Sequence, residues 1–244
     1  MKRILYSVFY HLGYRISELN SNSQNAFKTQ KYLMRSADIT VFDAGAHFGE
    51  TVVIYNKLFK NPSIYSFEPF LSSFEVLKRN VKTFPNVKIF NVALSNVSGE
   101  LDFYVNKSSA TNSILPTSKD STKNWGENLL ETVETVKINS ITIDEFVEKH
   151  NIEVIHILKI DTQGTEYEII QGASKTIEAN KIKVIYLEII IISTYVGQRY
   201  PDEIFLLLRK NGFRLYNQYN YTHSKSGELQ QFDAMFVHKS FDHE

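Results

Sequence analysis

Short apolar runs rich in β-branched residues alternate along the chain with stretches whose apolar residues recur at helical spacing. The runs predict strands at 38–45, 63–68, 87–93, 154–161, 182–189, 213–217 and 232–238. The intervening stretches predict helices at 48–59, 70–83, 165–179 and 201–211. Continuous apolar strands separated by such helices indicate a parallel α/β sheet with both faces covered.

The alternation changes in two places. Only a glycine-containing turn separates the last two strands, so they predict an antiparallel hairpin at the sheet edge. Residues 98–106 and 134–143 predict two further strands, joined by a long polar segment of the kind that is usually functional or disordered. We therefore expect an N-terminal helical extension at 1–36 and one domain at 37–244, with an insertion at about 98–143.

Composition narrows the functional class. Of 244 residues, 43% are apolar and 22% charged, which is ordinary for a globular protein, and the formal net charge is zero. A balanced charge provides no field for nucleic acid, so we expect no nucleic-acid partner. No run reaches the roughly 18 apolar residues of a transmembrane segment. The absence of cysteine excludes disulfides and thiolate metal sites and fits a cytoplasmic location.

The segment "VFDAGAHFGE" at 41–50 combines a strand end, a tight turn and a helix start. Gly45 permits the sharp turn, and Gly49 leaves room for a ligand or for helix packing. Such turns lie at the carboxyl ends of strands, where open α/β sheets bind ligands. Glu68, followed by Pro69, ends the second strand at the spacing expected of a ribose-binding acid. Its alternative role is a charge at the following helix N-terminus.

Asp43 distinguishes between possible ligands. An ionised aspartate beside a pyrophosphate is repelled, whereas a cation is attracted, so the turn suits S-adenosylmethionine better than NAD. An NAD(P)-dependent oxidoreductase, the alternative, requires the tighter G-x-G-x-x-G turn.

Six motifs occur in order: "VFDAGAHFGET", "YSFEP", "NVALSNVSGELDFYV", "ITIDEF", "ILKIDTQGTEYEIIQGA" and "YLEI". Together they resemble the FkbM family of S-adenosylmethionine-dependent methyltransferases over roughly residues 30–238. The resemblance implies a class I methyltransferase: a Rossmann-like, seven-stranded sheet of order 3-2-1-4-5-7-6 with the seventh strand antiparallel. It also implies O-methylation of a hydroxyl on a carbohydrate or natural product, so the expected partner is a small-molecule or glycan acceptor.

The resemblance matches Asp43, Gly45, Gly49 and Glu68 to the family's cofactor residues and places Asn91 and Ala93 beside the adenine. The expected cofactor site also includes His47 and Pro69. Two positions depart from the family pattern. His47 stands where asparagine is more usual, and Gln163 where glutamate is common. Because Gln163 removes a carboxylate from the expected catalytic region, a non-catalytic S-adenosylmethionine-binding module remains an alternative.

An alcohol acceptor is weakly nucleophilic, so a general base or a metal should assist it. The candidate catalytic residues are Asp161, Glu166 and His47. Their alternative roles are a helix N-cap, a charge in the first helical turn, and a contact to the methionine part of the cofactor. Lys159 lies on the same side of the strand as Asp161, and we expect it in a buried ion pair. Carboxylates alone are a weak metal signal, so we expect no metal.

The acceptor site is predicted from two loops and a strand end. The segment 107–131 contains Trp125, and the segment 193–201 contains Tyr195 and Arg199. Glu188 ends the fifth strand. We expect these four residues to bind the acceptor, with solvated loops that carry exposed aromatic residues as the alternative.

Overall fold

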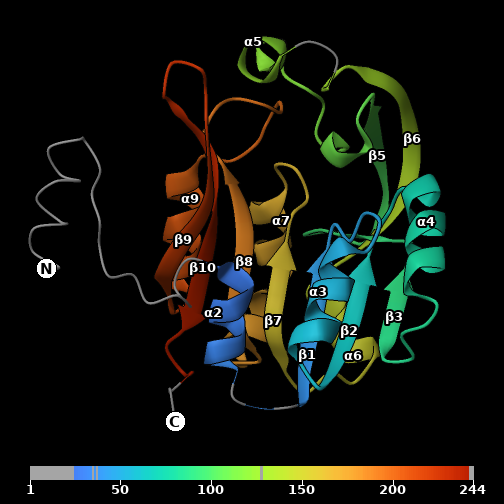
Figure 1. Cartoon of the computed structure of the whole chain (residues 1–244), viewed down its shortest axis with the longest axis vertical. Helices are drawn as coiled ribbons and strands as arrows, with labels where there is room; N and C mark the ends of the chain where they lie inside the picture. Colours follow the sequence, from blue (N-terminus) through green and yellow to red (C-terminus); the bar gives the residue numbers. More distant parts are fainter. Residues whose placement is uncertain (1–24, 35, 37, 127–128, 242–244) are drawn as a thin grey trace, which may run out of the picture.

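The computed structural model describes residues 25–34, 36, 38–126 and 129–241. A seven-stranded sheet of order β3-β2-β1-β7-β8-β10-β9 forms its centre (Figure 1). Strands β3, β2, β1, β7 and β8 pair in parallel, and β10 is antiparallel to both β8 and β9. This is the expected 3-2-1-4-5-7-6 arrangement with an antiparallel seventh strand, so the predicted fold class is confirmed.

The strands of the main sheet follow the predicted runs closely at its centre. Their bounds are β1 Asp38–Ala44, β2 Asn61–Phe67, β3 Val87–Phe90, β7 Ile155–Ile160, β8 Ile182–Ile190, β9 Phe213–His223 and β10 Leu229–His238. The predicted run 87–93 is shortened because Ala93–Leu94 forms β4, which joins a second sheet. The hairpin strands β9 and β10 are longer than predicted.

Helices cover both faces of the sheet, as the apolar runs predicted. Their bounds are α2 Ala26–Leu33, α3 Glu50–Leu58, α4 Leu71–Val81, α6 Ile143–Lys149, α7 Glu166–Gln171, α8 Ser174–Glu178 and α9 Pro201–Lys210. Helices α2 to α4 contribute to one buried cluster and α6 to α9 to another. Val41 and Phe42, adjacent in β1, belong to different clusters because successive side chains of a strand point to opposite faces.

Two predicted elements were wrong in detail. The helix expected at 165–179 is split into α7 and α8 near Gly172, where a Cβ atom would lie 2.1 Å from the carbonyl oxygen of Ser95. The strand expected at 134–143 ends at Ile141, and α6 begins instead. The Thr142 side chain caps this helix by accepting a 3.0 Å hydrogen bond from the Glu145 amide, which is half of a capping box.

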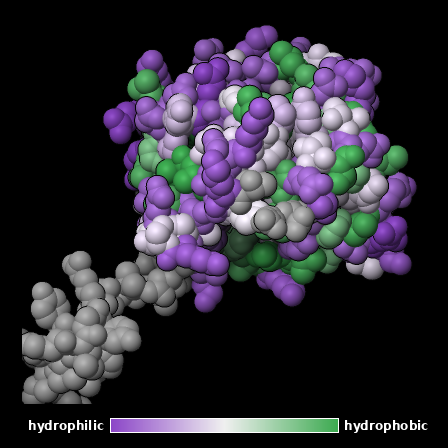
Figure 2. All heavy atoms as spheres, turned by 90° about the horizontal axis from the view of Figure 1, so that it is seen from above, coloured by the Kyte–Doolittle hydropathy of each residue, from purple (hydrophilic) through white to green (hydrophobic). Residues whose placement is uncertain are grey.

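The insertion forms a second sheet with β4, in the order β4-β6-β5, beyond the carboxyl ends of the main strands (Figure 1). Strands β5 (Gly99–Asn106) and β6 (Thr132–Ile141) pair antiparallel. Between them lie the 3-10 turn η1 (Ser109–Thr111) and the short helix α5 (Ser121–Trp125). Seen from this end, the surface is predominantly hydrophilic, with hydrophobic residues scattered over it (Figure 2).

Most of the predicted N-terminal extension, residues 1–24, lies outside the described residues. Its remaining part includes α2, whose Ala26 and Leu33 are buried against the main sheet. Among the helices that the structure describes, none combines the length and the apolar character needed to cross a membrane.

Candidate active site

The turn after β1 packs closely against the end of β7 and against helix α4. Gly45 has φ +74°, and a Cβ atom there would lie 1.9 Å from the carbonyl oxygen of Asp161, so only glycine lets this turn approach the end of β7. At Gly49, with φ +92°, a Cβ atom would lie 2.9 Å from Leu77 Cδ1 in α4. Gly49 therefore serves helix packing, which was one of its two expected roles.

A large cavity opens beside this turn, with about 930 Å³ of empty space including its mouth. The β1 turn, the end of β2, strand β4, the β7–α7 loop and the insertion enclose it. Five predicted cofactor residues line it: Gly45, His47, Glu68, Pro69 and Ala93. The other three, Asp43, Gly49 and Asn91, are not in its lining. Asn91 instead donates 2.9 Å hydrogen bonds to the carbonyl oxygens of Glu68 and Pro69.

The Glu68 carboxylate is held at the wall of this first cavity. It accepts hydrogen bonds from the backbone amides of His47 at 2.9 Å and Phe70 at 3.0 Å. Burial raises the pKa of Glu68 to about 7, although these two amides act in the opposite direction. Since a carboxylate has about four acceptor sites, it retains capacity for hydroxyl donors of a ligand.

Asp43 lies beneath the cavity, fully buried, with its Oδ1 3.1 Å from Lys159 Nζ. Lys159 Nζ is also 3.5 Å from Asp161 Oδ2, so the expected buried ion pair of Lys159 is confirmed. Burial raises the pKa of Asp43 despite this cation. Burial lowers the pKa of Lys159, but the two carboxylates raise it by more, and the net shift is upward. The charge of Asp43 is thus balanced within the protein.

Gln163 lies where the β7–α7 loop meets the end of β8. Its side-chain nitrogen donates to Glu188 Oε2 at 2.8 Å and to Asp161 Oδ1 at 3.3 Å. Its side-chain oxygen lies 2.9 Å from the hydroxyl of Tyr195. Burial, followed by the negative charge of Asp161, raises the pKa of Glu188 well above its ordinary value. One amide therefore connects two carboxyl groups and a tyrosine.

A second cavity, of about 500 Å³ with its mouth, lies on the other side of Gln163. Its lining comprises Ala110, Thr111, Trp125, Leu129, Leu130, Gln163, Glu188, Ile190, Thr194, Tyr195 and Gln231. Gln163 and Ala110 line both cavities and so form their shared wall. Three predicted acceptor residues meet here: Trp125, Glu188 and Tyr195.

Arg199, the fourth predicted acceptor residue, lines neither cavity. Its guanidinium lies 3.2 Å from Glu203 Oε1 and 3.7 Å from Glu168 Oε1, and it covers the ring of Tyr167. These contacts fix the start of α9 against α7.

Of the three candidate catalytic residues, Asp161 and His47 line the first cavity and Glu166 lines neither. Glu166 Oε1 accepts 3.2 Å hydrogen bonds from the amides of Thr162 and Gly164, so its carboxylate holds the loop before α7. Burial raises the pKa of Glu166 to about 7.

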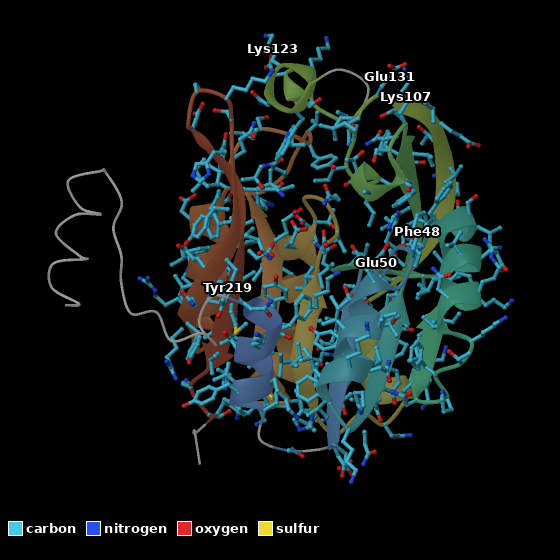
Figure 3. The ribbon with its side chains drawn as sticks, in the orientation of Figure 1. Phe48, Glu50, Lys107, Lys123, Glu131 and Tyr219 are labelled. Atoms are coloured by element: carbon cyan, nitrogen blue, oxygen red, sulfur yellow. The ribbon has the colours of Figure 1, made fainter. Side chains whose placement is uncertain are left out.

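His47 connects the β1 turn to the insertion. Its Nε2 lies 2.9 Å from Ser109 Oγ in η1, and its Nδ1 lies 3.8 Å from Glu50 Oε1. Figure 3 labels Glu50 at the start of α3. Burial lowers the pKa of His47, although Glu50 opposes this effect. The neutral form of the imidazole is therefore favoured.

Sequence reasoning missed the contribution of the insertion to the first cavity. Five of its residues are in the lining: Phe103, Ser109, Ala110, Asn112 and Ile114. Polar, aperiodic sequence offers no signal for such contacts. Gln163 was recognised only as a missing carboxylate. Within the described ranges, no group of three or more metal-ligating side chains is arranged to hold a metal ion.

The chain is similar in sequence to known methyltransferases. A family model described as "Methyltransferase FkbM domain" matches residues 43–215. The 2-O-methyltransferase NoeI of Sinorhizobium fredii is 23% identical over 181 residues, covering 68% of this chain and 69% of the relative. The hexuronic acid methyltransferase AglP of Haloferax volcanii is 23% identical over 143 residues, covering 58% of this chain and 53% of the relative. The match thus spans about half the length of AglP.

Among solved structures, an rRNA methylase from Streptococcus thermophilus superposes with a TM-score of 0.48 at 10% identity. The superposition covers 86% of this chain and 93% of that chain.

Proposed function

Because the chain belongs to the FkbM methyltransferase family, we propose that it methylates a hydroxyl oxygen of a carbohydrate. Methyl transfer and the use of S-adenosylmethionine follow from the family. The oxygen and the carbohydrate are supported by the names of two relatives, a 2-O-methyltransferase and a hexuronic acid methyltransferase.

The residues of the first cavity support it as the cofactor site. Its fixed Glu68 carboxylate suits the two ribose hydroxyls, and its wall beyond β2 includes apolar surface from Phe67, Leu94 and Phe103. When bound, S-adenosylmethionine supplies an electrophilic methyl group on a sulfonium. The carboxylate of Asp161, partly exposed in the same cavity, offers a negative charge for the cationic part of that ligand.

The shared wall at Gln163 is the observation that carries the proposal. Methyl transfer requires an acceptor oxygen aligned with the methyl carbon, and orientation can contribute roughly 7–11 kcal/mol of the barrier. Two adjacent cavities that share Gln163 and Ala110 in their linings support this arrangement, because a reactant in each would lie beside the other. Trp125 and Glu188 then lie on the acceptor side.

The acceptor hydroxyl must lose its proton as its oxygen gains the methyl group and the sulfur–carbon bond breaks. We assign the proton acceptor as Glu188, which lines the second cavity, whereas Asp161 lines only the first. Gln163 orients the Glu188 carboxylate through its 2.8 Å hydrogen bond. The products are then a methyl ether and S-adenosylhomocysteine.

A labelled-methyl assay with hydroxylated sugars tests the function. The label should enter an alkali-stable product, since ethers survive alkali and carboxylic esters do not. Alkali-labile label would show that the acceptor atom is a carboxylate oxygen and would contradict the proposal.

Two variants test the assigned roles. Glu188→Gln should lower kcat by about a hundredfold or more, with affinity for S-adenosylhomocysteine nearly unchanged. Asp161→Asn should weaken that affinity as well as turnover. A loss of turnover in Asp161→Asn alone, with full activity in Glu188→Gln, would transfer the proton-accepting role to Asp161.

A further inference from the structure

The charges that line the second cavity limit which sugars can bind there. We propose that it takes an uncharged sugar ring and discriminates against a sugar that carries a carboxylate. This inference rests on the proposed function for the identity of the ligand as a sugar. It concerns the choice among sugars, which neither the family nor the fold determines.

Among the residues that the structure describes, the lining of the second cavity includes no positively charged side chain. Of the described residues that line it, none is lysine, arginine or histidine, and Glu188 is the one carboxylic acid among them. Proteins generally bind carboxylates with arginine, lysine or groups of backbone amides. A carboxylated sugar therefore finds no cationic side chain in this lining.

Three described cations of the main sheet, the β8–α9 loop and the insertion are already paired. Lys159 is held between two carboxylates at the floor of the first cavity. Arg199 is paired with Glu203 outside both cavities. Lys107 Nζ lies 2.6 Å from Glu131 Oε2, and these two residues directly follow β5 and precede β6, respectively (Figure 3). Recruiting any of them for an acceptor would break an existing ion pair.

Glu188 disfavours a carboxylated acceptor in either protonation state. When ionised, it repels a second carboxylate within a site of low dielectric constant. When Glu188 is protonated, a form that its raised pKa makes more accessible, the acceptor carboxylate still leaves water without a cation to compensate it. An uncharged hydroxyl meets neither penalty, because both forms of Glu188 can hydrogen-bond to it.

The remaining lining suits a neutral ring with one apolar face. Leu130 and Ile190 are buried beside Tyr195 in one hydrophobic cluster, against which Trp125 packs. The indole nitrogen of Trp125 donates a 2.8 Å hydrogen bond to Thr194 Oγ1, which fixes the orientation of its ring. A sugar offers C–H groups to such surfaces and hydroxyls to carboxyl and amide groups.

Trp125 is the single tryptophan of the chain, so intrinsic fluorescence reports directly on the second cavity. The full chain, saturated with S-adenosylhomocysteine, is titrated with pairs of methyl glycosides of the same ring configuration, one neutral and one a uronide. We expect the neutral member to bind at least tenfold more tightly at pH 7. Equal or tighter binding of the uronides, or no response to any neutral glycoside, would overturn the inference.

Methyl transfer to the same glycosides is measured in parallel and separates this inference from the proposed function. A neutral glycoside that binds but accepts no methyl group overturns the function and leaves the discrimination intact. Efficient transfer to a hydroxyl of the uronide, at a rate equal to that of its neutral partner, overturns the discrimination and leaves the function intact.

A charge-insertion variant provides the converse test. Gln231→Lys places a cation in the lining and should shift the binding ratio toward the uronide by about tenfold, since a nearby ammonium compensates the carboxylate. Gln171→Lys makes the same charge change at an exposed position at the end of α7, outside both linings. It should leave the ratio unchanged. A folded Gln231→Lys variant with the original ratio would contradict the inference.

Discussion

The side-chain amide of Gln163 donates a 2.8 Å hydrogen bond to Glu188 and also lies 3.3 Å from Asp161, so it separates two carboxyl groups. The resemblance to the family implied that glutamate is common at this position. In this chain an amide donor replaces a third acid. Its backbone has φ +58°, a left-handed conformation that orients the side chain toward both carboxyl groups.

Gln163→Glu should lower kcat at pH 7 by at least about tenfold, because it exchanges a hydrogen-bond donor for a third acid beside Glu188 and Asp161. Steady-state kinetics and calorimetric titration with S-adenosylhomocysteine measure turnover and cofactor affinity separately. Affinity should fall less than kcat.

Gln163→Asn is the matched control, since asparagine tolerates a positive φ and keeps an amide but is one methylene shorter. It should retain the fold and show an intermediate kcat. Full activity of the glutamate variant would show that the hydrogen bond from Gln163 is not needed.

The sequence predicted those features of the candidate site whose residues lie close together along the chain. The turn after β1 and the acid at the end of β2 were predicted because strand ends and glycines follow one another within about 30 residues. The role of Gln163 depends instead on Glu188 and Tyr195, which other elements bring to it. No local pattern contains that information.

The partner of Asp43, like the partners of Gln163, could not be predicted from the sequence. Its charge was visible in the sequence and was assigned to a cationic ligand. Its partner in the structure is Lys159, which lies directly opposite on the neighbouring strand. Strand adjacency follows from the fold, but the register between strands that lie more than a hundred residues apart does not follow from either segment alone.

Cofactor affinity should depend on pH through Glu68. Its pKa is raised to about 7 by burial, whereas hydroxyl donors from a bound ribose favour the ionised form and lower the pKa in the complex. Binding therefore releases a proton below pH 7 and not well above it. We expect the affinity for S-adenosylhomocysteine to be constant above pH 8 and to fall as pH drops from 7 to 5, by up to about tenfold per unit.

Glu68→Gln is the control for this titration, since it keeps the shape and removes the ionisable group. Its affinity should be weaker at pH 8, by roughly 1.5–3 kcal/mol, and should show much less dependence on pH. A pH profile identical to that of the unchanged chain would mean that another group titrates.

Removing one partner of the ion pair between Asp43 and Lys159 should destabilise the fold more than removing both. Lys159→Met leaves a buried aspartate without its cation and should lower the free energy of unfolding by about 3–5 kcal/mol. Combining it with Asp43→Leu removes both charges and should recover much of this loss. Urea denaturation measures the free energy of unfolding of the single and the double variant.

Lys137→Met is a suitable control because Lys137 forms an exposed ion pair with Asp102 at 3.0 Å. Exposed pairs contribute little, so its unfolding midpoint should barely move. A double variant as unstable as Lys159→Met alone would show that the lysine stabilises the fold by packing and not by its charge.

Two glycine substitutions can separate the cost of a steric clash in the β1 turn from the cost of a positive φ. Gly45→Ala combines a positive φ with a Cβ atom 1.9 Å from the carbonyl oxygen of Asp161. Gly197→Ala has a similar φ of +86° and no atom within 4 Å of the added Cβ. The second variant should therefore report the backbone cost alone, about 1–2 kcal/mol.

Gly45→Ala should cost at least about 2 kcal/mol more in urea denaturation than Gly197→Ala, because the carbonyl it meets belongs to the end of β7 and overpacking there typically costs 1–3 kcal/mol. It should also weaken binding of S-adenosylhomocysteine, since displacing Asp161 and the turn alters two adjoining parts of the wall of the first cavity. Equal stability of the two variants would mean that β1 and β7 can separate at their carboxyl ends. The cavity would then tolerate a wider turn, and Gly45 would be required only for its positive φ.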